Sequence, residues 1–231
     1  MMILRADSLS KRYMRKSASS NTFLAVQTCS IALRAGTVTV LMGRSGSGKT
    51  TLLNMLAGLL QPTEGQVYLD DQSLYGMNDA LLSRVRNEHI SFVPQGRSAV
   101  DSLTVRENIM LPCALYGRTC REQADHWLEE LGIADLADVR TSELSGGELR
   151  RMAIARALTQ DGEILLADEP TGDLDDGNTD IVLRLLKDVA HKQNKAVMIV
   201  SHESIAVEYA DQLFMMNMGE LKPFAAAPVQ A

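Results

Sequence analysis

One eight-residue motif constrains the fold of this chain more than any other feature. Residues 43–50 read Gly-Arg-Ser-Gly-Ser-Gly-Lys-Thr and match G-x-x-x-x-G-K-[ST] in full. An apolar run at 38–42 precedes the motif and a helical pattern at 51–60 follows it, so the order is strand, loop, helix. Such a loop points successive backbone N–H groups inward, and the helix adds the positive end of its dipole. The motif therefore predicts a polyphosphate site in an α/β fold.

The residues of this loop are the first candidate nucleotide contacts. Lys49 offers a point charge to the β- and γ-phosphates and is also a candidate catalytic residue, and the Thr50 hydroxyl can ligate Mg²⁺. The full candidate set is Gly43, Arg44, Ser45, Gly46, Ser47, Gly48, Lys49, Thr50 and Thr51. The sequence gives no physical reason for an arginine at position 44.

A second apolar run, at 163–167, ends in two acids, Asp168 and Glu169. An acid at the carboxyl end of a strand beside the phosphate-loop strand lies where Mg²⁺ would bind. Asp168 is therefore the candidate metal ligand, directly or through water. Glu169, one residue later, is the candidate that polarises an attacking water.

The remaining patterns predict an α/β domain with a mostly parallel sheet. Strands are expected at 196–200 and 212–216, and a helix at 179–191 with Asn178 as its cap. Short strands at 3–8, 22–33 and 65–69 predict an antiparallel patch, polar residues 15–21 predict a loop, and 103–156 reads as helical throughout. We expect a single domain over 1–231, with its core at about 1–95 and 157–222, a helical insertion at about 96–156 and a tail at 223–231.

Composition excludes several classes of protein. A net charge of −6 argues against general binding of duplex DNA, which requires a basic face, and no nucleic-acid partner is expected. No apolar stretch is long enough to span a bilayer, and no secretory leader is present, so the chain is expected in the cytoplasm. Three widely spaced cysteines, Cys29, Cys113 and Cys120, suit a reducing compartment and read as small buried hydrophobic residues.

A second anion site is expected around Ser145, Gly146 and Gly147, which offer a hydroxyl and backbone N–H groups before a helix. Residues 144–148 read Leu-Ser-Gly-Gly-Glu and resemble the signature sequence of ATP-binding cassette (ABC) ATPases, as does the helix at 149–158. The resemblance runs from about residue 4 to residue 222. It implies the P-loop ATPase fold of that family, with an antiparallel β patch and a helical insertion. It also implies ATP and Mg²⁺ as ligands and a head-to-tail dimer, in which the signature of one copy covers the γ-phosphate bound by the other.

The same resemblance implies roles for four more residues. Tyr13 aligns with the aromatic residue that stacks on adenine, and Asp173 lies in the loop that crosses the dimer interface. Gln95 aligns with the glutamine that reaches Mg²⁺ or the attacking water. His202 aligns with the switch histidine, from which an imidazole can hydrogen-bond the γ-phosphate and Glu169.

Details of the sequence resemble one subgroup of the family. Glu148, Gly172 and residues 103–112 are similar to the subgroup that serves lipoprotein release, macrolide or peptide export, and cell division. This implies an integral-membrane permease on a separate polypeptide, with the chain peripheral on the inner face of the membrane. Grooves near Gln95 and residues 103–112 would receive a short cytoplasmic helix of that permease.

The sequence also bears on three functions other than export. A cassette that drives a membrane signalling or cell-division partner stays open. A soluble ABC ATPase acting on ribosomes or DNA is less favoured, because the chain has one P-loop and no sustained heptads between positions 50 and 144. A small GTPase is disfavoured, because Val197 stands where the guanine-reading N-K-x-D motif needs an aspartate.

Overall fold

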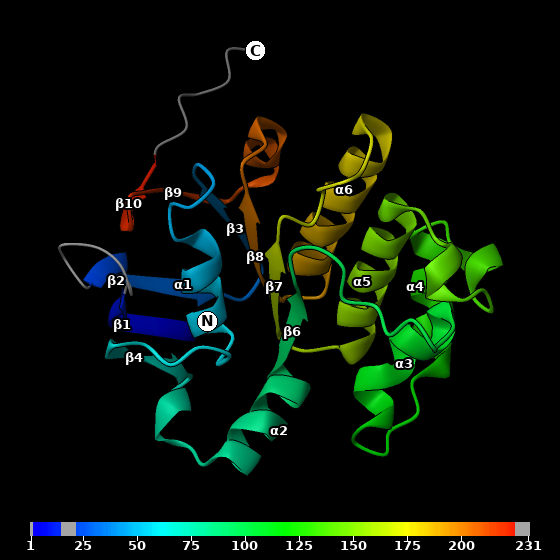
Figure 1. Cartoon of the computed structure of the whole chain (residues 1–231), viewed down its shortest axis with the longest axis horizontal. Helices are drawn as coiled ribbons and strands as arrows, with labels where there is room; N and C mark the ends of the chain where they lie inside the picture. The colour runs from blue at the N-terminus through cyan, green and yellow to red at the C-terminus, as the bar shows by residue number, and fades with distance from the viewer. Residues whose placement is uncertain (1, 15–21, 225–231) are drawn as a thin grey trace.

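Two β-sheets and six α-helices make up the described part of the computed structural model, which covers residues 2–14 and 22–224 (Figure 1). The loop expected at 15–21 and nearly all of the expected tail lie outside these residues. The larger sheet has the strand order β10-β9-β3-β8-β7-β6. Its strands are β3 (Thr37–Met42), β6 (Ile90–Val93), β7 (Ile164–Asp168), β8 (Ala196–Ser201), β9 (Gln212–Asn217) and β10 (Glu220–Pro223).

The larger sheet is parallel except for β10, which pairs antiparallel with β9. The predicted mostly parallel sheet is therefore confirmed, and the four predicted strands are β3, β7, β8 and β9. One detail of the prediction was wrong: β8 lies between β3 and β7, so the acidic strand is not the direct neighbour of the phosphate-loop strand. β6 was not predicted, because four residues are too short for a clear pattern.

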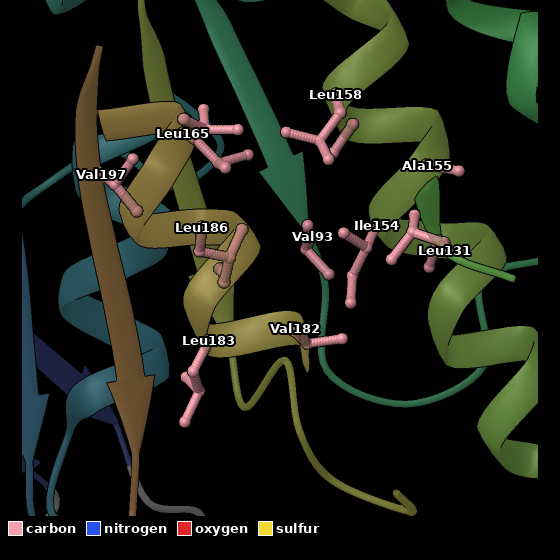
Figure 2. Packing of buried hydrophobic residues seen from close by; sticks show 14 of the residues in the cluster. Val93, Leu131, Ile154, Ala155, Leu158, Leu165, Val182, Leu183, Leu186 and Val197 are labelled. Atoms are coloured by element: carbon pink, nitrogen blue, oxygen red, sulfur yellow. The ribbon is translucent and has the colours of Figure 1, made fainter. Parts of the chain in front are cut away.

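Both faces of the larger sheet are covered, which explains its continuous apolar strands. On β7, Leu165 and Ala167 join the hydrophobic cluster that includes residues of α5 and α6. Ile164 and Leu166 join the other cluster, with α1 and the smaller sheet. Figure 2 shows the first cluster, where Leu165 and Val197 of the sheet lie beside Leu186 of α6, and Val93 of β6 lies beside Ile154 of α5.

The smaller sheet is antiparallel and has the order β2-β1-β4-β5, which confirms the predicted antiparallel patch. Its long strands β1 and β2 exceed the predicted segments, because bulges let the pair bend without breaking. The strands are β1 (Met2–Met14), β2 (Thr22–Arg34), β4 (Glu64–Leu69) and β5 (Gln72–Ser73).

The helices lie on both sides of the larger sheet (Figure 1). They are α1 (Lys49–Leu56), α2 (Asp79–His89), α3 (Val105–Ala114), α4 (Arg121–Glu130), α5 (Gly146–Gln160) and α6 (Asp176–Lys192). Short 3₁₀ helices are η1 (Leu74–Gly76), η2 (Ala134–Leu136), η3 (Thr141–Glu143) and η4 (Ser204–Tyr209). No helix within the described ranges is both long and apolar enough to cross a bilayer.

Two helical predictions need correction. Residues 103–156 are not helical throughout, because turns and 3₁₀ segments separate α3, α4 and α5. The cap of α6 is Asp175 rather than Asn178: the Asp175 side chain accepts a hydrogen bond from the Asn178 N–H at 2.9 Å. The polar first turn of α6 hid its true start from the apolar pattern.

The cysteines also depart from the prediction. Cys113 and Cys120 are buried as expected, with 3% and 5% exposure, but they form a disulfide that closes the loop between α3 and α4. Their Cα atoms lie 6.3 Å apart. Cys29 is free, and burial raises the pKa of its thiol to about 11, which keeps it protonated at neutral pH. A disulfide between helix ends depends on tertiary placement, which spacing alone does not reveal.

Candidate functional site

The phosphate loop joins β3 to α1 and closes around the Lys49 ammonium. Gly48 precedes the helix with φ 109°, and a Cβ there would lie 2.2 Å from the backbone oxygen of Ala25, so the position requires glycine. Lys49 is 5% exposed, and its Nζ donates to the carbonyl oxygens of Gly43 at 2.8 Å and Arg44 at 3.0 Å. Burial lowers the pKa of Lys49, while the carboxylates of Glu169 and Asp168 oppose that shift. Two loop carbonyls thus fix the position of this charge inside the loop.

A cleft of about 570 Å³ brings together most of the predicted nucleotide contacts. At one end is Tyr13, which the antiparallel pairing of β1 and β2 places opposite Phe23. The two rings stack with their centroids 5.7 Å apart. The predicted residues that line the cleft are Tyr13, Ser45, Gly46, Gly48, Lys49, Thr50, Thr51, Gln95 and Glu169. Sequence reasoning missed Phe23, Leu24 and Met218 at the apolar end. Phe23 and Leu24 showed only as an apolar pair after the expected loop at 15–21, and Met218 showed no signal of its own.

Asp168 ends β7 as a buried carboxylate, 2% exposed. Burial raises its pKa, and a hydrogen bond with Thr50 opposes this. Its Oδ2 is buried and has no hydrogen-bond partner among the residues that the structure describes. An unsatisfied buried carboxylate oxygen beside a hydroxyl fits a hard divalent cation such as Mg²⁺, which takes oxygen ligands.

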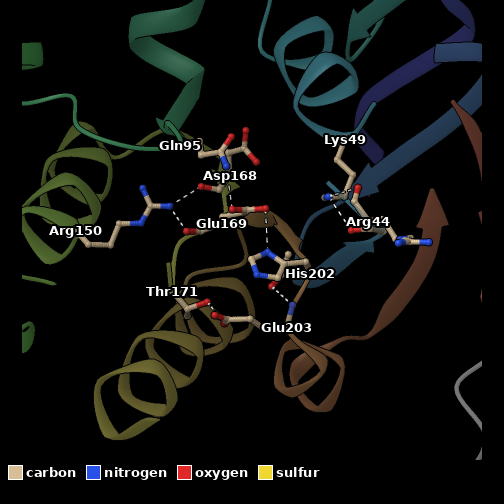
Figure 3. A network of polar contacts seen from close by, with 11 residues as sticks. Arg44, Lys49, Gln95, Arg150, Asp168, Glu169, Thr171, His202 and Glu203 are labelled. Carbon is tan, nitrogen blue, oxygen red and sulfur yellow. Dashed lines mark hydrogen bonds and ion pairs between the residues drawn. The ribbon is translucent and has the colours of Figure 1, made fainter. Parts of the chain in front are cut away.

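Glu169 follows directly and has an unusual backbone, with φ 50°. Its carboxylate lies between two predicted partners: Oε2 accepts from Gln95 Nε2 at 2.9 Å, and Oε1 lies 3.1 Å from His202 Nδ1 (Figure 3). These three side chains follow β7, β6 and β8, whose carboxyl ends meet at one edge of the parallel sheet. The arrangement can hold a carboxylate in a fixed direction at the mouth of the cleft.

The signature residues lie elsewhere. Ser145 caps α5 and forms a capping box with Glu148, whose Oε2 accepts from the Ser145 hydroxyl and N–H, both at 2.7 Å. The hydrogen bond from Ser145 lowers the pKa of Glu148. Gly146 and Asp173 line a separate small hollow of about 90 Å³. Within the described residues, none of Ser145, Gly146, Gly147 or Asp173 lines the phosphate-loop cleft.

Two loop residues are not explained by the cleft. Gly43 and Arg44 line a neighbouring hollow with Gln95, Glu169 and His202. The carbonyl oxygens of Gly43 and Arg44 accept hydrogen bonds from Lys49, and the Arg44 side chain is exposed. Nothing in the structure explains an arginine there. Ser47 is buried, and its hydroxyl oxygen has no hydrogen-bond partner within the described chain.

Comparison with known proteins identifies the family. The model of the ABC transporter family matches residues 26–172. A lipoprotein-releasing system ATP-binding protein, LolD of Xanthomonas euvesicatoria, is 33% identical over 98% of this chain and 93% of its own length. A macrolide export ATP-binding/permease protein, MacB 2 of Yersinia pestis bv. Antiqua, is 34% identical over 95% of this chain, which spans 32% of that longer protein.

Solved structures agree with the sequence relatives. A dimeric bacterial ABC transporter cassette superposes with a TM-score of 0.89 at 29% identity, covering 97% of this chain and all of that one. A dimeric post-hydrolysis cassette bound to ADP and phosphate gives a TM-score of 0.88, with the same identity and coverage. With the matched family model and the near full-length LolD relative, they show that the chain belongs to the ABC transporter family, as an ATP-binding and ATP-hydrolysing cassette.

Proposed function

We propose that the chain is the ATPase subunit of a membrane complex that exports or extracts a lipoprotein, a peptide or a hydrophobic drug. The names and coverage of the LolD and MacB relatives support this assignment. The observation that carries the catalytic part is the separation of two anion sites: the cleft holds the phosphate loop, and the signature serine lies outside it.

In this proposal, two copies pack head to tail and complete each other's sites. Ser145, Gly146 and Gly147 of one copy cover the γ-phosphate held by the phosphate loop of the other, and Asp173 lies at the interface. Closed symmetric dimers of this kind need each copy to offer both halves. The dimeric state of the two cassettes of similar structure supports the pairing.

Within one half, the loop binds the ATP phosphates and the aromatic end binds the base. Lys49 and the N–H groups of residues 43–51 surround the β- and γ-phosphates and stabilise the charge that develops during transfer. Tyr13 stacks on adenine, supported by the ring of Phe23. Thr50, Asp168 and the amide oxygen of Gln95 would hold Mg²⁺, which supplies charge stabilisation at the transferring phosphoryl group.

Glu169 orients the attacking water and accepts its proton. Gln95 and His202 hold its carboxylate through the hydrogen bonds at 2.9 and 3.1 Å. His202 also reaches the γ-phosphate, so loss of that phosphate changes a contact of the same carboxylate. ATP binding then closes the dimer and hydrolysis reopens it, which moves the membrane partner.

We further propose one domain over 1–231, in which about 96–156 forms a helical subdomain that meets a separate permease at the inner face of the membrane. A hollow of about 270 Å³ beside α2 and the loop after α3 is the candidate surface for a short permease helix. Its lining includes Tyr116 of the helical subdomain but not Gln95 or residues 103–112, so this surface differs from the grooves expected from the sequence. Exposed apolar side chains at its rim support this, with Leu59 at 53% and Tyr116 at 40% exposure.

The test of the catalytic assignment is Glu169→Gln. We expect phosphate release to fall by more than about 100-fold, because the carboxylate that accepts the proton is gone. ATP should still promote dimerisation, measured by light scattering. Glu163→Gln is the matched control, because Glu163 directly precedes the amino end of the same strand and should turn over like the parent. Parental turnover in Glu169→Gln would refute the assignment.

A further inference from the structure

Arg150 is a buried cation that no predicted role explains. It lies in the second turn of α5, is 6% exposed, and points from the helix toward the carboxyl ends of β6 and β7 (Figure 3). Nη1 donates to the carbonyl oxygen of Pro94 at 2.6 Å, and Nη2 donates to those of Asp168, at 2.5 Å, and Glu169. One side chain therefore bridges the helix that Ser145 caps and the strand ends that carry Gln95, Asp168 and Glu169.

The burial of this guanidinium is costly. Burial lowers its pKa, and the more distant charges of Asp168, Asp173 and Glu169 oppose the shift. Arg150 forms no ion pair within the described part of the chain, and its Nε has no hydrogen-bond partner. An apolar side chain would meet the packing needs of a buried helix position with less desolvation. The arginine is therefore better explained by the backbone carbonyl groups that its N–H groups hold in place than by a gain in stability.

What the donors hold is a strained backbone. Glu169 has φ 50°, a left-handed conformation that non-glycine residues adopt only when their surroundings enforce it. Its N–H donates to Val200 at 2.8 Å, and its carbonyl oxygen accepts from both Gly172 N, at 3.1 Å, and Arg150. This conformation directs the carboxylate toward Gln95 and His202.

We propose that Arg150 is a positioning residue, which holds the backbone of Glu169 in this conformation and ties it to the helix that carries the signature. A shift of α5, when Ser145 gains or loses a phosphate, is thereby transmitted to the strand end that carries Glu169. The inference rests on the proposed function, because Arg150 acts through the carboxylate that orients water. Arg150 thereby couples the Glu169 half-site to the signature half-site within one copy, in addition to the contact between the two copies.

The experiment compares Arg150→Gln with Arg156→Gln. Arg156 lies on the same helix, is half-buried, and donates to the backbone oxygen of Ser98 at 2.8 Å, so its loss removes a similar contact away from Glu169. We expect Arg150→Gln to lower kcat about 10- to 100-fold, since small misplacements of a catalytic group have effects of that size. The Kd for a fluorescent ATP analogue should stay within about twofold, and Arg156→Gln should keep kcat within about twofold.

A double variant separates positioning from a structural role. If Arg150 acts only through Glu169, adding Arg150→Gln to Glu169→Gln leaves the residual rate unchanged, because the carboxylate is already gone. A further loss in the double variant, or a parental kcat in Arg150→Gln, would overturn the proposal. Should Arg150→Gln fail to fold, Arg150→Lys, which keeps the charge with one donor nitrogen, is expected to fold with a reduced kcat, and a parental kcat there overturns the proposal equally.

The same assays distinguish this inference from the proposed function. Parental turnover in Glu169→Gln defeats the catalytic assignment, whatever Arg150 does. An inactive Glu169→Gln beside a fully active Arg150→Gln defeats only the positioning role.

Discussion

The phosphate-loop end and the signature end of this molecule are prepared in opposite ways. At the phosphate loop, a buried ammonium is held by loop carbonyls, and a cleft of about 570 Å³ is already shaped around it. At the signature, an exposed serine donates its hydroxyl to its own helix through Glu148. The first end is preorganised within one chain, whereas the second must give up an internal hydrogen bond to bind a phosphate. Under the proposed function, this difference means that a single copy holds a nucleotide site and needs the signature of a second copy to complete the catalytic site.

The largest test of this contrast mixes two inactive chains. Lys49→Ala loses the phosphate-loop charge, and Ser145→Arg blocks the signature, so each alone should hydrolyse ATP at background rate. An equimolar mixture should recover about a quarter of the parental rate, because half of the dimers are mixed and each has one intact composite site. Phosphate release in the mixture measures this directly.

The control for that mixture pairs Lys49→Ala with Glu169→Gln. Both lesions lie at the same cleft, so a mixed dimer contains no intact site and should stay inactive. Recovery in this control, or none in the first mixture, would contradict the head-to-tail arrangement.

The second test attacks the preorganised end through its backbone. Gly48→Ala brings a Cβ to 2.2 Å from the backbone oxygen of Ala25 at φ 109°, so the loop must shift. We expect a destabilisation of about 1–3 kcal/mol and a marked loss of ATP affinity, measured by denaturant unfolding and nucleotide titration. Gly117→Ala, also at positive φ but in open space, should lower stability without altering ATP affinity. Equal affinity losses in both variants would mean that the rigidity of the phosphate loop does not matter.

The smallest test concerns the exposed end and its pH dependence. The hydrogen bond from Ser145 depresses the pKa of Glu148, so the stability that the ionised group contributes is present above its unfolded pKa and is lost as pH falls through the folded value. In Glu148→Gln, the loss of unfolding free energy between neutral and acid pH should therefore be smaller by about 0.3–1 kcal/mol, the usual size for a charge in a first helical turn.

Thermal unfolding from neutral to acid pH measures this effect. Glu143→Gln, which removes an exposed acid just before the signature, should follow the parent. A parental curve for Glu148→Gln would show that the capping box does not depend on charge.

Local patterns were sufficient for much of the fold. The apolar runs around the phosphate loop and Asp168 predicted β3 and β7, because strands covered on both faces carry continuous apolar residues. β6 escaped because it is only four residues long, and the cap of α6 was misassigned because its first turn is polar.

The candidate site shows the same division. Gln95, Glu169 and His202 were predicted from their motifs, and the structure brings all three together. Phe23 and Arg150 were missed, because one depends on cross-strand register and the other on a long side chain reaching across strand ends. The disulfide between Cys113 and Cys120 was missed for a similar reason: it joins two helix ends that only tertiary packing brings close.

Successive residues of β7 face alternate hydrophobic clusters, so each position of the strand is assigned to one side of the sheet. Leu166 and Asp168 are two residues apart, so the acid faces the side where α1 and Thr50 lie, while Ala167 faces α5 and α6. Deleting one residue within the strand would exchange the two sides and send the acid into the helical layer. A one-residue deletion inside β7 would therefore cost the fold and the chemistry together.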